Sequence, residues 1–265
     1  MDIKEILDKA FEKYHKKEFL FADPLEFPHK YKGRENQEIV ALIASCFAYG
    51  NVKNLKNSVR KILEPLGEKP FEAVKNGDFR KWRCDYSTFR HRFNTGDDVA
   101  SLLFIIKRVL EDFGDLKNFF FHCDGNLRDA KNSLVNFTEK ALSFLENHGI
   151  GQDASGIGFL FPSPRNGSAC KRLNMFLRWM VRKDEIDFGH WSEFGCENLV
   201  IPVDTHIARI SRHLGLTSRK DASWKTAREI TGNLKFFDGK DPVRYDFALS
   251  HIGILKDRII LPDLR

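Results

Sequence analysis

The sequence has no long apolar run and no recognisable export signal. No stretch of about 18 uncharged apolar residues occurs anywhere in its 265 residues, so we expect no membrane span and no membrane partner. The N-terminus carries acidic residues from position 2 onward and lacks the apolar core of a signal peptide. We therefore expect a protein of the cytoplasm.

The sequence also lacks the cysteine spacings that hold metals. No CxxC pair and no tight set of four is present, which argues against zinc and iron–sulfur sites and favours reduced, structural thiols. We expect neither a metal nor a cofactor. The five cysteines are spread along the chain: Cys46, Cys84, Cys123, Cys170 and Cys196.

Several catalytic motifs are absent as well. There is no GxxxxGK[ST] phosphate loop, no HExxH and no GxSxG. The stretch GIGQDA (149–154) matches a dinucleotide fingerprint by its letters, but a helical pattern precedes it where the fingerprint needs a strand. The formal charge of +6 favours a polyanionic partner, although ribosomal and RNA-modifying proteins share this balance.

Helical periodicity dominates what is present, and no strand ladder is recognisable. Apolar residues recur at the i, i+3, i+4 spacing, and glycines at 114 and 149 follow two of these segments as helix stops. Residues 185–198 read as a solvent-facing insertion. The segments expected to be helical are 37–50, 52–67, 98–114, 127–149, 171–184, 205–215, 223–237 and 243–255.

Two neighbourhoods share one design, a turn followed by a helix that opens on an ionisable residue. The first is PRNGSACK, and the second is IPVD leading into THIARISRHLG. Backbone N–H groups at a helix start and in a tight glycine turn can bind a phosphate oxygen. Taken alone, Asp204 is a good N-cap and Lys171 a solvated lysine at a helix start.

In combination the two neighbourhoods resemble the helix-hairpin-helix, Gly/Pro/Asp-rich DNA glycosylases. Those enzymes carry a hairpin of the form LPGxGxKTA and a catalytic acid in a V-D-T-H type motif. By this resemblance Lys171 falls on the catalytic lysine, Asp204 on the catalytic aspartate, Gly167 on the first hairpin glycine and Asn174 on an asparagine one turn later.

The chain departs from the pattern in the hairpin and in one spacing. Ala169 stands where the second hairpin glycine is expected, and Arg165-Asn166 replaces Leu-Pro. The separation of 33 positions between Lys171 and Asp204 indicates an insertion. This spacing looks most like the archaeal type of 8-oxoguanine DNA glycosylase, and the whole chain is similar to a bacterial family of unknown function over most of residues 24–260.

The resemblance implies an all-α, two-lobed helix-hairpin-helix glycosylase fold with an active cleft between the lobes. We expect one lobe to be a helical bundle over residues 37–203 that ends in the hairpin and the Lys171 helix. The other lobe would join residues 1–36 to residues 204–265. We expect a monomer.

The resemblance further implies a bifunctional DNA glycosylase and AP lyase acting on oxidised purine, 8-oxoguanine by analogy, in damaged duplex DNA. Lys171 would attack the sugar, Asp204 would assist, and a Schiff base would allow elimination of the 3′ phosphate. Two alternatives stay open: a monofunctional glycosylase for alkylated bases or uracil, and a non-catalytic DNA-binding module.

Further roles follow by analogy with the same enzymes. Gly167, Ser168 and Ala169 would contact DNA phosphate, while Tyr49 and Asn51 would fill the gap left by an extruded nucleotide, although both residue types also cap and pack. Candidates for the base pocket are Asp246, Phe247 and Cys170, and His206 is expected to support the aspartate from the helix start.

Overall fold

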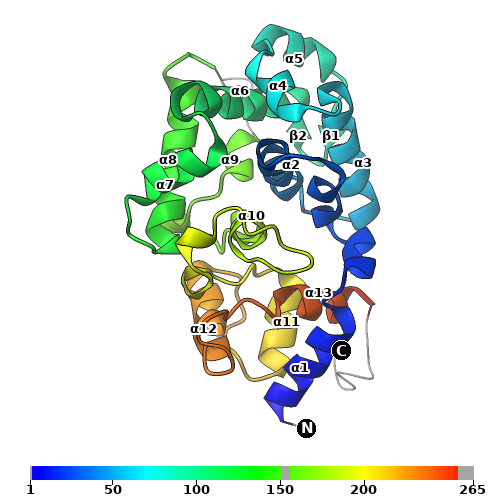
Figure 1. Ribbon diagram of the computed structural model, residues 1–265, viewed down its shortest axis with the longest axis vertical. Helices are drawn as coiled ribbons and strands as arrows, with labels where there is room; N and C mark the ends of the chain where they lie inside the picture. Colours follow the sequence, from blue (N-terminus) through cyan, green and yellow to red (C-terminus); the bar gives the residue numbers. More distant parts are fainter. Residues whose placement is uncertain (1, 151–155, 256–265) are drawn as a thin grey trace. The chain divides into compact units, whose positions relative to one another are not determined.

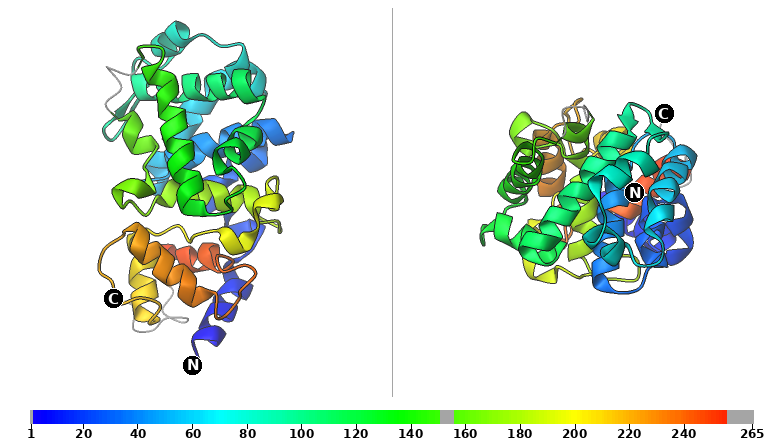
Figure 2. Two further views of the ribbon diagram at one scale, coloured as in Figure 1. Left: turned by 90° about the vertical axis from the view of Figure 1, so that its left-hand side faces the viewer. Right: turned by 90° about the horizontal axis from the view of Figure 1, so that it is seen from above.

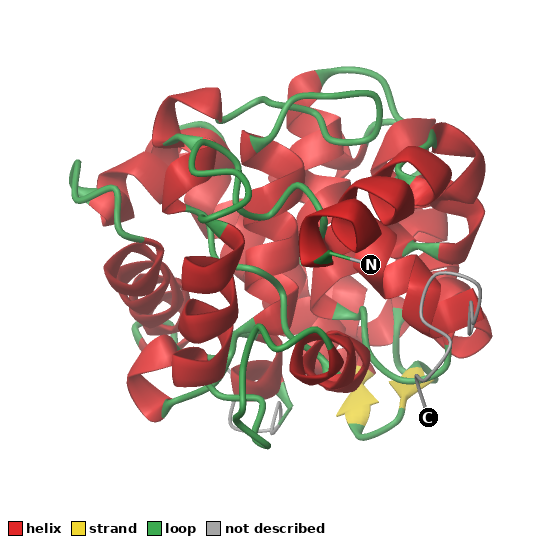
Figure 3. Cartoon of the chain, turned by 90° about the horizontal axis from the view of Figure 1, so that it is seen from below, coloured by secondary structure: helices red, strands yellow, loops and turns green. Residues whose placement is uncertain are grey.

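The computed structural model describes residues 2–150 and 156–255, and these residues are almost entirely helical (Figure 1). This confirms the prediction of an all-α protein. The strands of the described part are a pair of two residues each, drawn in yellow in Figure 3. Residues 151–154 of the GIGQDA stretch, the next residue Ser155 and the last ten residues of the expected second lobe lie outside the described residues.

The chain divides into two compact units. The first unit comprises Met1–Leu20 and Pro164–Arg265, and the second unit comprises Phe21–Ser163. These boundaries differ from the expected ones at 36/37 and 203/204. Residues 21–33 join the second unit because the short 3-10 helices Pro24–Glu26 and Pro28–Lys30 pack against the first bundle helix, α2.

The second unit is built around α6, which contacts α4, α5, α7 and α8. The periodicity of its apolar residues predicted this long helix, and Gly114 ends it with a backbone φ of 84°. Helices α7 and α8 lie against each other, as Figure 2 shows in green. The elements are α2 (Arg34–Cys46), α3 (Val52–Leu63), α4 (Pro70–Lys75), α5 (Phe79–Asp85), β1 (Arg90–His91), β2 (Asn94–Thr95), α6 (Gly96–Phe113), α7 (Leu116–Asp124), α8 (Ala130–Glu146) and α9 (Ile157–Leu160).

The first unit joins the N-terminus to the C-terminal part of the chain. Helix α1 packs against α13, and α13 packs against α11. The hydroxyl of Tyr245 donates to a carboxylate oxygen of Asp8 at 2.9 Å, which ties the N-terminal helix to the segment before α13. The helices are α1 (Ile3–Tyr14), α10 (Lys171–Val181), α11 (Thr205–His213), α12 (Trp224–Leu234) and α13 (Asp246–Leu255).

The central helix of the first unit is α10, whose residues after Lys171 are all buried, as its apolar surface predicted. The prediction that residues 185–198 face solvent is wrong. Trp191 and Phe194 are fully buried, and the Trp191 ring meets Phe176 edge-on. The backbone N–H of Trp191 donates to the Met180 carbonyl at 2.7 Å, so the insertion folds back over the end of α10.

None of the described helices is both long and apolar enough to cross a lipid bilayer.

Candidate active site

Asp204 caps helix α11. Its backbone is extended, and its carboxylate oxygen Oδ1 accepts hydrogen bonds from the N–H groups of His206 and Ile207, both at 2.9 Å. These two groups have no partner inside the helix, so the cap satisfies part of the helix start. His206 contributes through its backbone, as expected for a supporting residue. Asp204 is therefore an N-cap, and this structural role uses only one of its two carboxylate oxygens.

The other oxygen of Asp204 faces Lys171. The Lys171 Nζ lies 3.5 Å from Asp204 Oδ2, and the two side chains are 29% and 32% exposed. A partly exposed ion pair of this kind contributes about 0 to 1 kcal/mol to stability. Stability alone thus gives little reason for an aspartate at a cap that asparagine or serine would fill equally well. Both side chains of the pair are therefore partly accessible to solvent.

The turn before α10 sets the position of Lys171. Gly167 adopts a φ of 77°, in the left-handed region that favours glycine, and its N–H donates to the Pro164 carbonyl at 3.0 Å. Cys170 also has a positive φ, 48°, directly before the helix. Asn174 holds this conformation from inside, because its buried amide donates to the Ala169 carbonyl at 2.9 Å.

Helix α12 anchors the same turn from the other side. The backbone N–H of Trp224 donates to the Gly167 carbonyl at 2.9 Å, and Ser168 pairs with Ser223 in an isolated antiparallel bridge. Ser223 is also the N-cap of α12. The sequence contains no sign of this contact, because backbone hydrogen bonds between distant segments leave no residue pattern.

The three predicted phosphate-binding residues differ in their access to solvent. Gly167 is exposed and Ser168 is half-buried, whereas Ala169 is buried. Arg165 and Asn166, which replace the usual Leu-Pro, are both exposed. The outer surface of the turn is therefore residues 165–168, and Ala169 acts through its carbonyl on Asn174.

Cys170 is not accessible to a base or a nucleic acid. Its side chain is almost fully buried, and its Sγ donates to the Ser168 carbonyl at 3.4 Å. Burial raises the pKa of the Cys170 thiol to about 12, against the smaller lowering effects of a side-chain hydrogen bond with Ser168 and of the charge of Arg172. The thiol is protonated at neutral pH, so it is no competitor of Lys171 as a nucleophile.

The structure does not support the expectation that Asp246 and Phe247 line a base pocket. Both are buried at the start of α13. Arg178 of α10 donates to Asp246 Oδ2 at 2.6 Å and also to Asp187 Oδ1 at 3.2 Å. The Phe247 ring lies 4.2 Å from the His251 ring, between centroids. A buried, hydrogen-bonded ion pair and a packed ring hold α10, α13 and the insertion together instead.

Tyr49 and Asn51 lie in the second unit, in the turn between α2 and α3. The Asn51 side chain caps α3 by accepting from the N–H groups of Lys53 and Asn54. Tyr49 is half-buried and donates to Asn94. Both side chains therefore have structural partners, and no sequence pattern indicated the aromatic rings near Tyr49.

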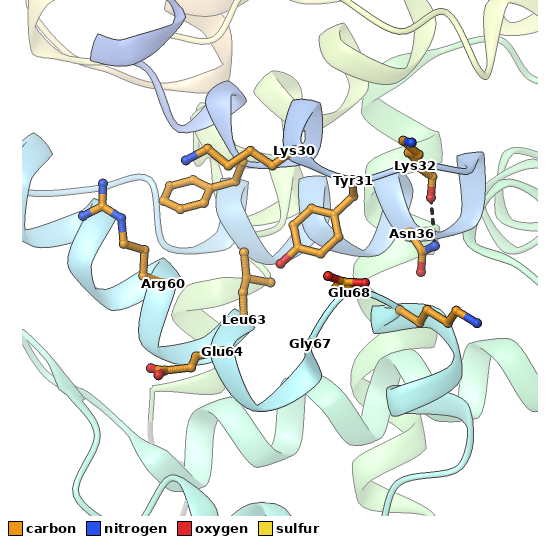
Figure 4. A pocket seen from close by; sticks show the side chains of 11 residues that line it. Lys30, Tyr31, Lys32, Asn36, Arg60, Leu63, Glu64, Gly67 and Glu68 are labelled. Carbon is orange, nitrogen blue, oxygen red and sulfur yellow. Dashed lines mark hydrogen bonds between the residues drawn. The ribbon is translucent and has the colours of Figure 1, made fainter.

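A recess of about 1020 Å³ in the second unit is shown in Figure 4. Phe27, Tyr31 and Leu63 supply its apolar surface, and the hydrogen bond from Asn36 to the Lys32 carbonyl lies at its edge. Neither Lys171 nor Asp204 lines it. Within the described residues, no three His, Cys, Asp or Glu side chains gather as metal ligands.

Comparison with known proteins gives a single family. A family model described as "Protein of unknown function (DUF2400)" matches residues 23–255. Neither a curated protein nor a solved structure matches the chain.

Proposed function

This chain belongs to the DUF2400 family of proteins of unknown function, and we propose that it is a bifunctional DNA glycosylase and AP lyase. The observation that carries the proposal is the distance of 3.5 Å between Lys171 Nζ and Asp204 Oδ2, two groups separated by 33 residues of sequence. The proposed substrate is an oxidised purine, 8-oxoguanine by analogy, in duplex DNA. The analogy rests on the resemblance of the two motifs.

In the first step the Lys171 amine attacks the anomeric carbon of the damaged nucleotide. A bond forms between Nζ and C1′, the bond from C1′ to the base breaks, and the base leaves with the electron pair. Positive charge develops on the sugar, and Asp204 Oδ2 is close enough to stabilise it and to accept a proton from the attacking amine. Oδ1 stays on the helix N–H groups, which keeps the carboxylate oriented.

In the second step the sugar ring opens to a Schiff base between Lys171 and C1′. Loss of a proton from C2′ then allows the bond from C3′ to its phosphate oxygen to break, which cuts the strand. Hydrolysis of the imine returns the free lysine. The atoms and electrons balance with water as the sole co-reactant.

In this proposal the turn before α10 binds the DNA backbone. Residues 165–168 form its outer surface, with a glycine that permits close approach and an exposed arginine beside it. Backbone N–H groups at the start of a helix favour a phosphate at this point. The anchoring by Trp224 and Asn174 keeps the turn rigid, so little conformational entropy is lost on binding.

Borohydride trapping on duplexes that carry single lesions tests the proposal. Borohydride reduces the imine to a stable amine, so the parent protein should give a covalent adduct, and Lys171→Gln should give none while it still binds the duplex. Lys183→Gln, an exposed lysine just beyond α10, is the matched control and should trap like the parent. Base release without an adduct would indicate a monofunctional glycosylase, and binding alone would indicate a DNA-binding module.

A further inference from the structure

A group of aromatic rings on the second unit lies open to solvent. Strands β1 and β2 form a hairpin whose two turn residues are Arg92 and Phe93, beside α3 in Figure 1. Phe93 is 52% exposed and Phe159 of α9 is 41% exposed. The Tyr49 ring stacks on Phe93 at 6.0 Å, and Phe159 meets Phe93 edge-on at 4.6 Å. We call Tyr49, Phe93 and Phe159 the aromatic surface.

Buried polar side chains hold this surface in place. The hydroxyl of Tyr49 donates to Asn94 Oδ1, and the Asn94 amide donates to Asp98 Oδ2 at 3.0 Å. The other oxygen of Asp98 accepts from the Gly156 N–H at 2.9 Å, directly before α9. Asn94 and Asp98 are both fully buried. The network therefore joins three distant segments at the base of the exposed rings.

A buried histidine ties the hairpin to the neighbouring turn and helix. His91 Nδ1 lies 2.9 Å from the Ser58 hydroxyl of α3, and His91 Nε2 lies 3.1 Å from the Tyr49 carbonyl. At the turn itself, Arg92 adopts a φ of 56°, a strained value for a residue with a side chain. The hairpin that presents Phe93 is therefore held by buried polar groups and has one backbone position in the left-handed region.

The hairpin also carries arginine. A recess of about 610 Å³ beside it is lined by Arg80, Arg83 and Arg90. Arg83 pairs with Asp97 at 2.7 Å. In the part of the chain that the structure describes, Arg80, Arg90 and Arg92 form no ion pair with an acidic side chain. Phe93 lies three positions after Arg90, a span of at most about 11 Å along the chain.

We propose that this face of the second unit binds single-stranded DNA, with bases stacked on the aromatic surface and phosphates in the arginine recess. Proteins that bind single strands combine a cationic groove for the backbone with aromatic rings for the bases. A base in a duplex has both faces covered by its neighbours, whereas an unpaired base can stack on Phe93. The uncompensated arginines favour a polyanion over an apolar protein surface.

This inference goes beyond the glycosylase proposal, because it uses neither Lys171 nor Asp204. Fluorescence anisotropy with a labelled oligothymidine at low salt measures the affinity of the protein for single-stranded DNA. Phe93→Ala should weaken binding about tenfold, the scale at which removal of one stacked ring acts. Phe236→Ala is the matched control, since Phe236 is 86% exposed and lies in the first unit.

A Phe93→Trp variant distinguishes direct stacking from damage to the fold. It should restore the affinity that alanine loses, and the emission of the new indole should be quenched when the oligonucleotide is added. The four native tryptophans are all buried, so an indole at position 93 gives a distinct exposed signal. An unquenched indole at saturating oligonucleotide would contradict the stacking.

The arginine recess has a separate readout in the salt dependence. Arg90→Gln should make the plot of log affinity against log salt shallower by about 0.7, the value for one phosphate contact on a single strand. The proposal is overturned if Phe93→Ala binds oligothymidine as tightly as the parent.

Discussion

The two oxygens of Asp204 have different partners, so two substitutions separate the cap from the charge. Asn is as good an N-cap as Asp, and Asp204→Asn should keep the free energy of unfolding within about 0.5 kcal/mol of the parent. Asp204→Ala should lose about 1 kcal/mol, because two helix N–H groups lose their acceptor.

Both substitutions should abolish base release, since both remove the carboxylate that faces Lys171. Urea unfolding and a base-release assay on the same preparations measure the two effects. An Asn variant that keeps full activity would show that the negative charge is not needed.

Asp184 makes stability depend on pH in the acid range. Burial by itself would raise its pKa, but the hydrogen bond with His15 and the charge of Arg182 outweigh this and hold the pKa well below the ordinary 3.8. The stabilisation is therefore complete above about pH 4 and is lost as the pH falls through the lowered value.

Asp184→Asn should lower the free energy of unfolding by roughly 1 kcal/mol at pH 7. Below about pH 4 the free energies of unfolding of the variant and the parent should approach each other. Urea unfolding of both proteins between neutral and acid pH measures this difference in the free energy of unfolding. A difference that grows as the pH falls would contradict the assignment.

At the scale of elements, the glycine directly before α9 packs closely against the side chains of Asn94 and Asp98. A Cβ at Gly156 would lie 2.2 Å from the Asn94 amide nitrogen and 2.5 Å from Asp98 Oδ2. Gly156→Ala should therefore destabilise the second unit by about 1 to 3 kcal/mol. Two residues on, a Cβ at Gly158 meets nothing within 4 Å.

Gly158→Ala is thus the matched control and should change the free energy of unfolding by less than about 1 kcal/mol. Thermal unfolding of the two variants compares them directly. Equal stability would mean that the network around Asp98 is looser than the contacts indicate.

The sequence predicted elements where a repeated pattern exists and missed those without one. The long helices α6 and α8 follow from apolar spacing, because a buried face repeats with the helical turn. The β1–β2 hairpin was missed, since two strands of two residues have no measurable period. The insertion after α10 was misjudged because Trp191 and Phe194 stand among polar and glycine residues, which suggested exposure.

The candidate site was predicted in part for a related reason. Lys171 and Asp204 were found because a local motif surrounds each of them, and the structure brings the two together. The anchoring of the turn by Trp224 and the burial of Asp246 were not foreseen. Both depend on which distant segments meet, and only the packed chain decides that.

At the scale of the whole molecule, the two proposed sites lie in separate compact units. The first unit contains the complete Lys171 and Asp204 pair with its turn, and the second contains the aromatic surface and the arginine recess. The expected boundary at 203/204 would have divided the pair. The sequence shows where helices end, and it does not show which helices pack together.

The identity of the nucleophile is tested most directly by locating the lysine that borohydride links to DNA. The trapped complex would be digested with nuclease and protease, and the modified peptide identified by mass spectrometry. We predict a reduced sugar adduct on Lys171, in a chain that has many other exposed lysines to serve as an internal comparison. An adduct on any other lysine, or equal trapping by the parent and Lys171→Gln, would contradict the proposed mechanism.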